Sequence, residues 1–194
     1  MIALIDYDAG NIRSVEKALA ALGEETEVTR DAERILAADR VILPGVGSFG
    51  DAMGKLHSFQ LVDVIKETIR RKTPFLGICL GLQLLFERSE ESPGVEGFGI
   101  LKGEILRIPE KDGLKIPHIG WNSLTFPNPG RLFEGIDRQS YMYFVHSYYL
   151  KARNPEDVAA TTWYSTDIHA AVEHDNILPV SSIRRRAVNW VLEF

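Results

Sequence analysis

The sequence predicts an α/β fold with a mostly parallel sheet, helices on both faces of that sheet, and added antiparallel strands in the C-terminal half. First, short apolar runs alternate with helical patterns through the first half of the chain. Second, those runs are continuously apolar, as expected of parallel strands that are buried on both faces. Third, the pattern changes after Glu91 to β-rich segments with alternating polarity. We expect residues 1–194 to form a single domain.

Strands and helices alternate along the first half in a regular order. Apolar runs predict strands over 1–7, 25–30, 40–45 and 74–79. Helical spacing of apolar residues predicts helices over 11–22, with Asn11 as its cap, and over 32–39, 61–72 and 80–89. This alternation is typical of strand–helix–strand units, which place consecutive strands parallel in one sheet.

The second half is predicted to add antiparallel strands at one side of the sheet. Its β-rich segments are 98–108, 117–126, 141–152 and 157–164. Residues 168–180 are predicted to form a hairpin, with Asp175-Asn176 as a two-residue turn. A helix over 181–194, capped by Ser181, closes the chain.

Composition and charge are those of a globular protein in water. The chain is 45% hydrophobic and 25% charged, with a formal net charge of −5. This charge argues against non-specific nucleic-acid binding, which needs a basic surface. No segment approaches the ~20 apolar residues of a membrane span, and the N-terminus lacks the basic region of a signal peptide. We therefore expect a cytoplasmic protein with neither a nucleic-acid nor a membrane partner.

The only cysteine, Cys79, is a candidate nucleophile. It lies between Gly77 and Gly81, where a buried strand is expected to turn into a helix. This arrangement is the thiol counterpart of the Gly-x-Ser-x-Gly turn that exposes a nucleophile at the end of a strand. The following helix is expected to lower the pKa of Cys79, and the Leu80 amide is a candidate oxyanion donor. A free cysteine is often simply a buried apolar residue, but the flanking glycines favour the nucleophile.

Other candidate residues fit ordinary structural roles when each is taken alone. The turn of Gly45, Val46 and Gly47 suits an oxyanion site, because glycines let backbone amides approach a ligand, but it also suits a plain strand end. Gln83 lies one helical turn beyond Cys79 and on a similar face. The remaining candidates read singly as a solvated charge run, a half-buried strand and a core turn: Glu91; His146, Ser147 and Tyr148; Trp121 and Asn122.

Taken together, these segments resemble a known enzyme family. "GICLGLQLLFE" resembles the nucleophile segment of class I glutamine amidotransferases. The resemblance narrows to the glutaminase subunits of imidazole glycerol phosphate synthase through four further segments: "DYDAGNIRSVEKAL", "LPGVGSFGDAM", "PHIGWN" and "YFVHSYY". It runs from residue 1 to about 178 and resumes in the last helix.

The resemblance implies an activity in histidine biosynthesis that uses no cofactor or metal. Glutamine is hydrolysed to glutamate and ammonia through a Cys79 thioester. The ammonia then passes to a (β/α)₈-barrel synthase subunit in a heterodimer, which makes imidazole glycerol phosphate. Matching positions implies these roles: Gly45, Val46, Gly47 and Leu80 at the oxyanion; Gln83, Glu91, Ser147 and Tyr148 on glutamine; Trp121 and Asn122 at the partner.

The sequence departs from this family after Leu178. The family has a base histidine and, two residues later, a glutamate between that strand and the last helix. Here only Pro179 and Val180 separate Leu178 from Ser181. Two explanations stay open: the sequence as written lacks a short segment, or the chain is a binding subunit without the proton acceptor.

The five histidines offer no ready substitute for the missing base. His169 comes nearest along the predicted hairpin, but the register turns it to the other face, and we interpret it as an ordinary strand residue. His57 and His174 are expected at the surface. A sister amidotransferase with another ammonia acceptor is a further alternative, against which "PHIGWN" and "DYDAGN" argue.

Overall fold

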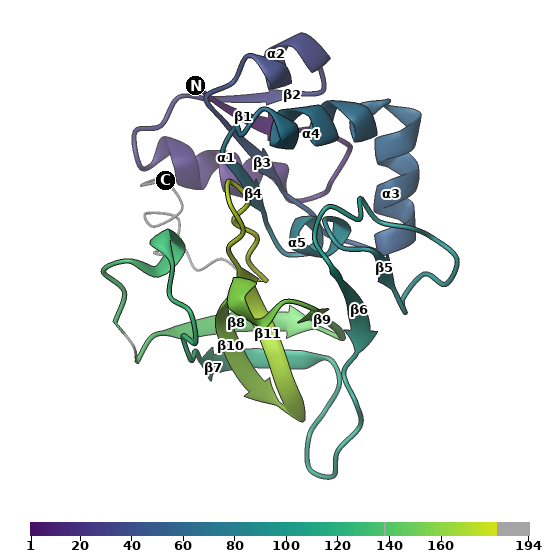
Figure 1. Cartoon of the computed structure of the whole chain (residues 1–194), viewed down its shortest axis with the longest axis vertical. Helices are drawn as coiled ribbons and strands as arrows, with labels where there is room; N and C mark the ends of the chain where they lie inside the picture. Colours follow the sequence, from purple (N-terminus) through teal and green to yellow (C-terminus); the bar gives the residue numbers. More distant parts are fainter. Residues whose placement is uncertain (138, 182–194) are drawn as a thin grey trace.

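The computed structural model describes residues 1–137 and 139–181. Figure 1 shows two halves, with the parallel strands and their helices in one and the antiparallel strands of the later sequence in the other. The helix predicted over 181–194 lies outside the described residues, apart from Ser181. Within the described part, no helix is both long enough and apolar enough to cross a membrane.

The first half confirms the predicted parallel sheet. Four strands pair in the order β2-β1-β3-β4, and every pairing is parallel. The strands are β1 (Ile2–Ile5), β2 (Thr26–Thr29), β3 (Arg40–Leu43) and β4 (Phe75–Gly77). The helices are α1 (Ile12–Ala20), α2 (Ala32–Leu36), α3 (Phe49–Ser58), α4 (Leu61–Arg70) and α5 (Leu80–Leu84).

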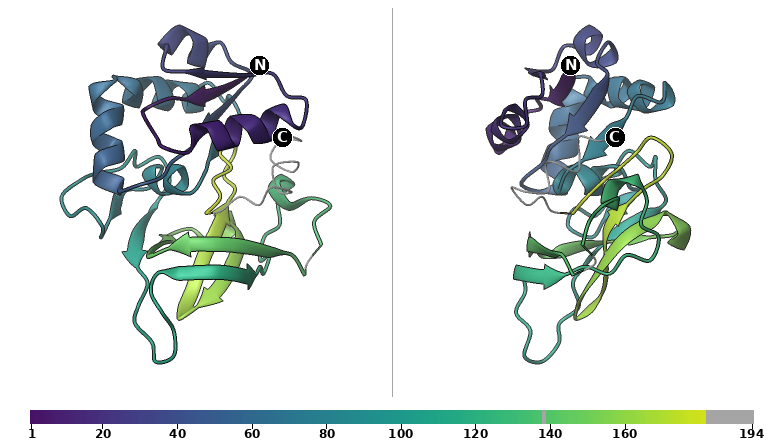
Figure 2. Two further views of the ribbon diagram at one scale, coloured as in Figure 1. Left: turned by 180° about the vertical axis from the view of Figure 1, so that it is seen from behind. Right: turned by 90° about the vertical axis from the view of Figure 1, so that its left-hand side faces the viewer.

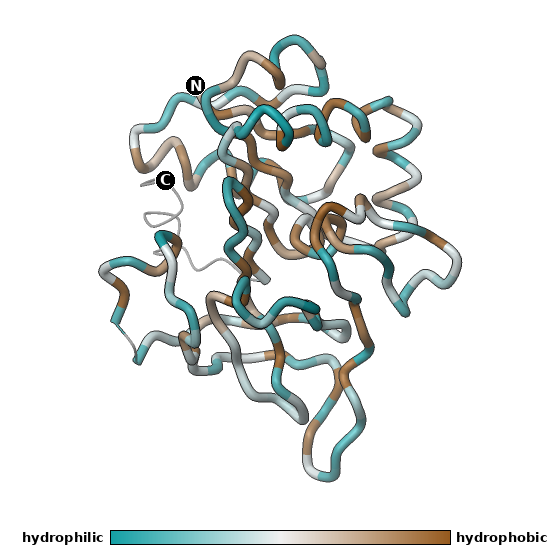
Figure 3. Tube along the Cα trace, in the orientation of Figure 1, coloured by the Kyte–Doolittle hydropathy of each residue, from teal (hydrophilic) through white to brown (hydrophobic). Residues whose placement is uncertain are grey.

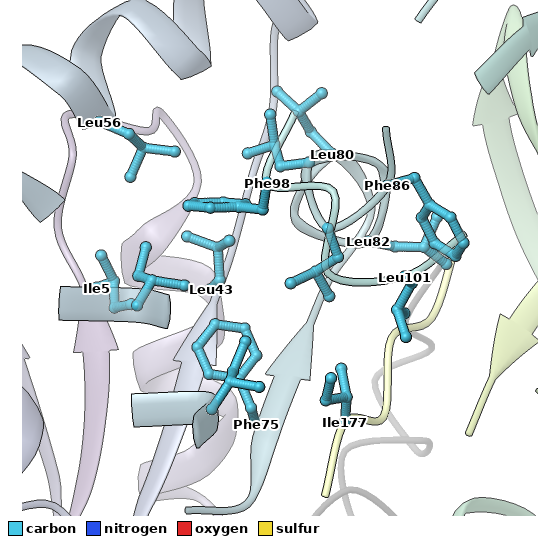
Figure 4. Close-up of a cluster of buried hydrophobic side chains, with 14 of the residues drawn as sticks. Ile5, Leu43, Leu56, Phe75, Leu80, Leu82, Phe86, Phe98, Leu101 and Ile177 are labelled. Carbon is cyan, nitrogen blue, oxygen red and sulfur yellow. The ribbon is translucent and has the colours of Figure 1, made fainter. Parts of the chain in front are cut away.

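Helices cover both faces of this sheet, because alternate strand residues point to opposite sides. Ile5, Leu43 and Phe75 pack with the helices α2 to α5 in one cluster. Figure 4 shows this cluster, where side chains of α5 lie beside those of β3 and β4. On the other face, Ile2 and Leu4 pack with α1 and with the small strands of the second half. The hydropathy trace in Figure 3 accordingly shows apolar residues gathered along the central strands.

Two helices differ from the prediction. Helix α3 was not predicted, and it begins directly after the 45–48 turn, where the Ser48 hydroxyl accepts the Asp51 N–H at 3.3 Å. The helix predicted over 80–89 is shorter, since α5 ends at Leu84. The following Leu85 and Phe86 are both fully buried. A surface helix buries only one stripe of side chains. Because two consecutive residues are buried here, the chain leaves the helical conformation after Leu84.

The strands β5 to β11 of the second half form two further sheets instead of joining the parallel sheet (Figure 2). Apart from the parallel β5–β6 pair, its pairings are antiparallel, and the strand orders are β10-β11-β9-β6-β5 and β7-β8. The strands are β5 (Arg88–Ser89), β6 (Gly103–Arg107), β7 (His118–Ser123), β8 (Tyr141–His146), β9 (Tyr148–Ala152), β10 (Val158–Tyr164) and β11 (Thr166–Val172). Short 3₁₀ turns cover Arg131–Phe133 and Pro155–Asp157.

The predicted hairpin around Asp175-Asn176 is confirmed. Antiparallel bridges join His174 to Ile177 and Ala171 to Val180, and Asp175 has a positive φ of 58°. Its second arm also lies parallel to β4, through bridges from Phe75 to Ile177 and from Ile78 to Val180. Segment 177–180 is therefore both the second arm of the hairpin and the edge of the parallel sheet next to Cys79.

Candidate active site

Cys79 sits at a strained turn between β4 and α5. Its backbone has φ 56° and ψ −110°, a conformation that L residues rarely adopt. Two hydrogen bonds fix the turn, from Ile78 N–H to the Leu43 carbonyl at 3.0 Å and from Cys79 N–H to the Val180 carbonyl at 2.8 Å. Such strain costs about 1–3 kcal/mol and persists only where the surroundings enforce it. The residue is half-buried and packs against the apolar cluster that includes Ile78 and Leu178.

Gly81 allows this turn by its lack of a side chain. A Cβ at Gly81 would lie 2.0 Å from the Leu43 carbonyl oxygen, closer than two such atoms can approach. The first turn of α5 therefore packs directly on the backbone of β3. This close approach is the physical reason for a glycine two residues after Cys79.

The pKa of Cys79 moves in the direction opposite to the prediction. Burial raises the pKa of the thiol, and the Leu80 backbone N–H bonded to the sulfur offsets only part of that rise. The expected lowering by a helix N-terminus is wrong for two reasons. Helix α5 has only 5 residues, and removing a thiolate from water costs more than this short helix returns.

The predicted oxyanion segment lies against the nucleophile turn. A Cβ at Gly45 would lie 2.8 Å from both the Gly81 nitrogen and the Leu80 Cβ, so only glycine lets this segment come so close. The buried Tyr7 hydroxyl donates to the Pro44 carbonyl at 2.8 Å and fixes the residue before the segment. Burial, followed by the negative charge of the nearby Cys79, raises the pKa of Tyr7, which keeps this donor protonated.

Glu91 lies at the other end of the oxyanion segment, against the start of α3. Its carboxylate accepts the Phe49 N–H at 2.8 Å, and the neighbouring Ser92 hydroxyl accepts the Gly50 N–H at 2.9 Å. These bonds satisfy free amides at the helix N-terminus, where a negative charge is also favourable. Glu91 is thus held at the first residue of α3, which follows the exposed residues Val46 and Gly47 closely in the chain.

Two further predicted substrate contacts, Gln83 and Tyr148, are brought together. The Gln83 side-chain amide reaches the Tyr148 carbonyl at 3.5 Å, which links α5 to the start of β9. Ser147 occupies the corner between β8 and β9, where its carbonyl accepts the Ile108 N–H at 2.9 Å. Residues separated by more than sixty positions in the sequence therefore meet beside the nucleophile helix.

The two predicted partner residues lie on different faces of the β7–β8 sheet. Trp121 is 57% exposed and shares the outer face with four other large apolar side chains, which are Ile119, Tyr141, Tyr143 and Val145. Asn122 belongs to the inner face, where its side-chain amide donates to the Trp163 carbonyl at 2.9 Å. The alternation of a strand explains the difference, since neighbouring residues point to opposite sides.

The histidines of the described residues are hydrogen-bonded to other groups or lie at exposed positions. His118 pairs with His146 at 3.2 Å. His169 accepts the Ala152 N–H at 3.0 Å and pairs with β9, as expected of an ordinary strand residue. His174 meets Asp157 at 2.9 Å, and both His174 and His57 are exposed, as predicted.

The departure from the family pattern falls directly beside the nucleophile. Val180 pairs with Ile78 and accepts the Cys79 N–H. The two residues that stand in place of the family's histidine segment, Pro179 and Val180, therefore lie beside the turn at Cys79. Across 1–137 and 139–181, no imidazole is found bonded to the sulfur of Cys79.

Three residues of the site were missed by sequence reasoning. Tyr7 and Ser92 act through hydrogen bonds to backbone groups, and His118 acts on another side chain. Tyr7 carried the only usable signal, as a hydroxyl at the carboxyl end of an apolar strand, where ligand sites of α/β sheets lie. The other two depend on contacts between distant segments that no local pattern encodes.

Comparison with known proteins agrees with this geometry. The family described as "Glutamine amidotransferase class-I" matches residues 3–183. The imidazole glycerol phosphate synthase subunit HisH of Moorella thermoacetica is 50% identical over 179 residues, which are 92% of this chain and 84% of that protein. HisH of Aquifex aeolicus is 47% identical, over 90% of this chain and 84% of that protein.

A solved structure extends the likeness to the fold. The crystal structure of a glutamine amidotransferase superposes with a TM-score of 0.73 at 17% identity, covering 100% of this chain and 95% of that one. At this identity the likeness concerns the fold alone. The family match and the relatives of high identity also bear on function. They favour an enzyme over a non-catalytic binding subunit. The chain therefore belongs to the class I glutamine amidotransferases, among the HisH subunits of imidazole glycerol phosphate synthase.

Proposed function

We propose that this chain hydrolyses glutamine to glutamate and ammonia and delivers the ammonia to the synthase subunit of imidazole glycerol phosphate synthase. The observation that carries the proposal is the strained turn at Cys79, with the Leu80 amide at its sulfur and the Gly45 segment packed against it. Strain of this kind is retained where a nucleophile must be exposed at a strand end. The names of the close relatives supply the pathway.

The chemistry follows from these positions. The Cys79 thiolate attacks the carboxamide carbon of glutamine, a C–S bond forms, and the electron pair of the C=O bond moves to oxygen. Backbone amides of Leu80 and of the 45–47 segment stabilise that oxyanion. The electron pair on oxygen then re-forms the C=O bond and the C–N bond breaks. The nitrogen takes up the proton that the Cys79 thiol released to water and leaves as ammonia. Water attacks the resulting thioester, which releases glutamate and restores the thiol.

Gln83, Glu91, Ser147 and Tyr148 are proposed to hold the amino-acid part of glutamine. Gln83 and the 147–148 corner face each other across one hydrogen bond, and Glu91 stands at the start of α3 beyond the oxyanion segment. A carboxylate suits the substrate ammonium group, and side-chain and backbone amides suit its carboxylate.

The outer face of the β7–β8 sheet is proposed as the docking surface for the (β/α)₈-barrel subunit. Five large apolar side chains are exposed there by 41–62%, and Trp121 meets Tyr143 edge-on with 5.6 Å between ring centres. Contiguous exposed aromatic surface is unusual on a protein without a partner, and Trp and Tyr supply much of the affinity of protein interfaces. The occupant is the synthase subunit, because ammonia must pass between the two active sites without escaping.

Glutamate release measured with the barrel subunit present tests this proposal. We expect turnover of glutamine by the unaltered chain and a loss of about 10³-fold or more in Cys79→Ala. His57→Asn, an exposed histidine on α3, serves as a control that leaves the rate unchanged. No glutamate at saturating glutamine and partner would contradict the proposal.

The pH dependence of thiol labelling gives a second test of the same site. Because burial raises the pKa of Cys79 above its ordinary value of 9.0, little thiolate is present at neutral pH. In the free chain, labelling by a small neutral electrophile should rise about tenfold for each pH unit and still be rising at pH 9. A plateau near pH 7 would show a thiol activated by a group outside the described residues.

A further inference from the structure

A line of hydrogen bonds crosses the inner face of the β7–β8 sheet and ends at the carbonyl of Tyr148. That carbonyl is bonded to His146 Nδ1 at 2.9 Å and to Gln83 Nε2 at 3.5 Å. His146 Nε2 meets His118 Nδ1 at 3.2 Å. His118 Nε2 in turn meets the Asn122 side-chain amide at 3.5 Å. The line therefore joins the β7–β8 sheet to Gln83 and Tyr148, two of the predicted glutamine contacts.

Only one arrangement of protons satisfies every bond in this line. A carbonyl oxygen can only accept, so His146 Nδ1 carries a hydrogen. In a neutral ring His146 Nε2 must then accept, and His118 Nδ1 must donate to it. Burial lowers the pKa of both rings, that of His118 to about 4, so both are neutral at pH 7. The remaining His118 nitrogen accepts from the amide of Asn122.

The His118 ring is held rigidly as a donor. It stacks between Phe144, at 4.9 Å between ring centres and 15°, and Tyr164, at 3.9 Å and 14°. The residue is only 2% exposed, and its strand position pairs directly with that of His146. The stacked rings prevent His118 from turning away, so its Nδ1–H fixes the orientation of the His146 ring.

His146 closes the corner through which the chain passes from β8 to β9. The two strands belong to different sheets, and Ser147 between them is in neither strand. The bond from the His146 ring to the Tyr148 carbonyl spans this corner and sets the direction of that carbonyl. Since the same oxygen receives the Gln83 amide, the ring also sets where the Gln83 side chain rests.

We propose that His146, oriented by His118, is a positioning residue for the glutamine contacts formed by Gln83, Ser147 and Tyr148. Neither histidine touches the reacting atoms. His146 acts through the shared Tyr148 carbonyl, and His118 acts through His146. This inference rests on the proposed glutaminase function and adds to it residues that hold the substrate contacts in place.

Two variants at His146 distinguish the roles of its two ring nitrogens. His146→Asn keeps an N–H donor near the Nδ1 position, whereas His146→Gln moves its amide to the Nε2 position and loses the bond that closes the corner. Glutamine affinity is measured by calorimetry in a Cys79→Ala background, so that no turnover is needed. We expect His146→Gln to weaken glutamine binding about 5- to 10-fold, as for the loss of a hydrogen bond, and His146→Asn to remain within about twofold. His57→Asn is the matched control and should bind as the background does.

The same variants in the complex with the barrel subunit distinguish positioning from chemistry. His146→Gln should raise KM for glutamine by a similar factor, with kcat changed less than KM. Equal losses in His146→Asn and His146→Gln, or no loss in either, would overturn the inference. Failure of the Cys79→Ala background itself to bind glutamine would instead overturn the proposed function.

A spectroscopic readout keeps the inference testable if His146→Gln does not fold. Nitrogen-15 NMR of the unaltered chain at pH 7 reports which ring nitrogen carries the hydrogen. We expect the Nδ1–H form for both His118 and His146. An Nε2–H form of His146 would contradict its bond to Tyr148 and overturn the inference.

Discussion

The parallel sheet and the β7–β8 sheet bury their side chains in opposite ways. Every residue of β1 and β4 is buried, because helices or other strands cover both faces. In β7 and β8, buried or half-buried residues alternate with exposed ones, and the exposed set is largely apolar. The parallel sheet is covered on both faces by other parts of the chain, whereas the β7–β8 sheet leaves one largely apolar face exposed.

This difference also separates the two tasks that the proposed function requires. Enclosure on both faces holds the Cys79 turn in its strained conformation. The half-covered sheet places His118 and His146 on its inner face and Trp121 on its outer face. A change in the parallel sheet should therefore cost stability and chemistry together, and a change on the outer face should cost only association.

The largest effect is expected from Gly81→Ala, which breaks the enclosed region. Its Cβ would lie 2.0 Å from the Leu43 carbonyl oxygen, so β3 and α5 must separate. We expect the unfolding free energy to fall by about 3 kcal/mol or more. We also expect glutaminase activity to be lost. Denaturant unfolding measures the change.

Gly54→Ala is the matched control for that substitution. Gly54 lies within α3, and nothing stands within 4 Å of a Cβ built there. Alanine should stabilise this helix by about 0.5–1 kcal/mol. Equal stability of the two variants would show that the nucleophile turn is not enforced by close packing.

The next effect is pH dependence centred on the inner face of the β7–β8 sheet. Unfolded histidine takes up a proton below its ordinary pKa of 6.5, whereas burial holds the pKa of His118 at about 4. Between about pH 4 and pH 6.5 the unfolded state therefore binds more protons than the folded state. The stability due to His118 is full above about pH 6.5 and falls toward pH 4. The loss attributable to His118 is on the order of 3 kcal/mol.

Chemical denaturation at several pH values checks this dependence. His118→Phe keeps a ring between Phe144 and Tyr164 but cannot titrate, so its stability should change less with pH. His57→Asn should keep the slope of the unaltered chain. An unchanged slope in His118→Phe would place the pH dependence elsewhere.

A third change sharpens the comparison on the outer face. Trp121→Ser should weaken binding of the barrel subunit about 30- to 100-fold, as for an interface anchor, with little change in unfolding free energy. Trp163→Ser is the control, because Trp163 is equally exposed, at 56% against 57%, but lies on β10 and stacks with Lys111. Calorimetric titration of the partner into each variant gives the affinities, and equal losses would argue against a docking face confined to β7 and β8.

The smallest effect is expected from Tyr7→Phe. This variant removes only the hydroxyl that holds the Pro44 carbonyl at the start of the oxyanion segment. We expect a loss of about 1 kcal/mol in stability and a fall in kcat of a few fold, since the segment is less firmly placed. His57→Asn, at an exposed position of α3, should change neither quantity, and denaturant unfolding together with steady-state kinetics of both variants decides.

Local patterns in the sequence were enough for the parallel sheet and for the nucleophile turn. Continuous apolar runs can be satisfied only by burial on both faces, and glycines around Cys79 allow the close approach seen at Leu43. The resemblance to the amidotransferase family supplied Gln83 and Tyr148, which residue-by-residue reasoning read as ordinary. The structure brings those two together across 65 positions.

Other features depended on contacts that the sequence does not display. The pKa of Cys79 is set by how deeply the turn is buried, which a helix-end argument does not capture. Which of Trp121 and Asn122 points inward depends on which segment packs against β7, and the His118–His146 pair follows from the register of β7 with β8. Local patterns fix neither of these, because register depends on which strands meet.

The proposed function requires that Cys79 attack the side-chain amide carbon of glutamine. Its most direct test uses a glutamine analogue with an electrophilic carbon in place of the carboxamide, followed by intact-mass and peptide analysis of the complex with its partner. We expect one label for each chain, located on Cys79, and slower labelling when glutamine is added. Labelling elsewhere, or labelling of Cys79 that glutamine does not slow, would contradict it.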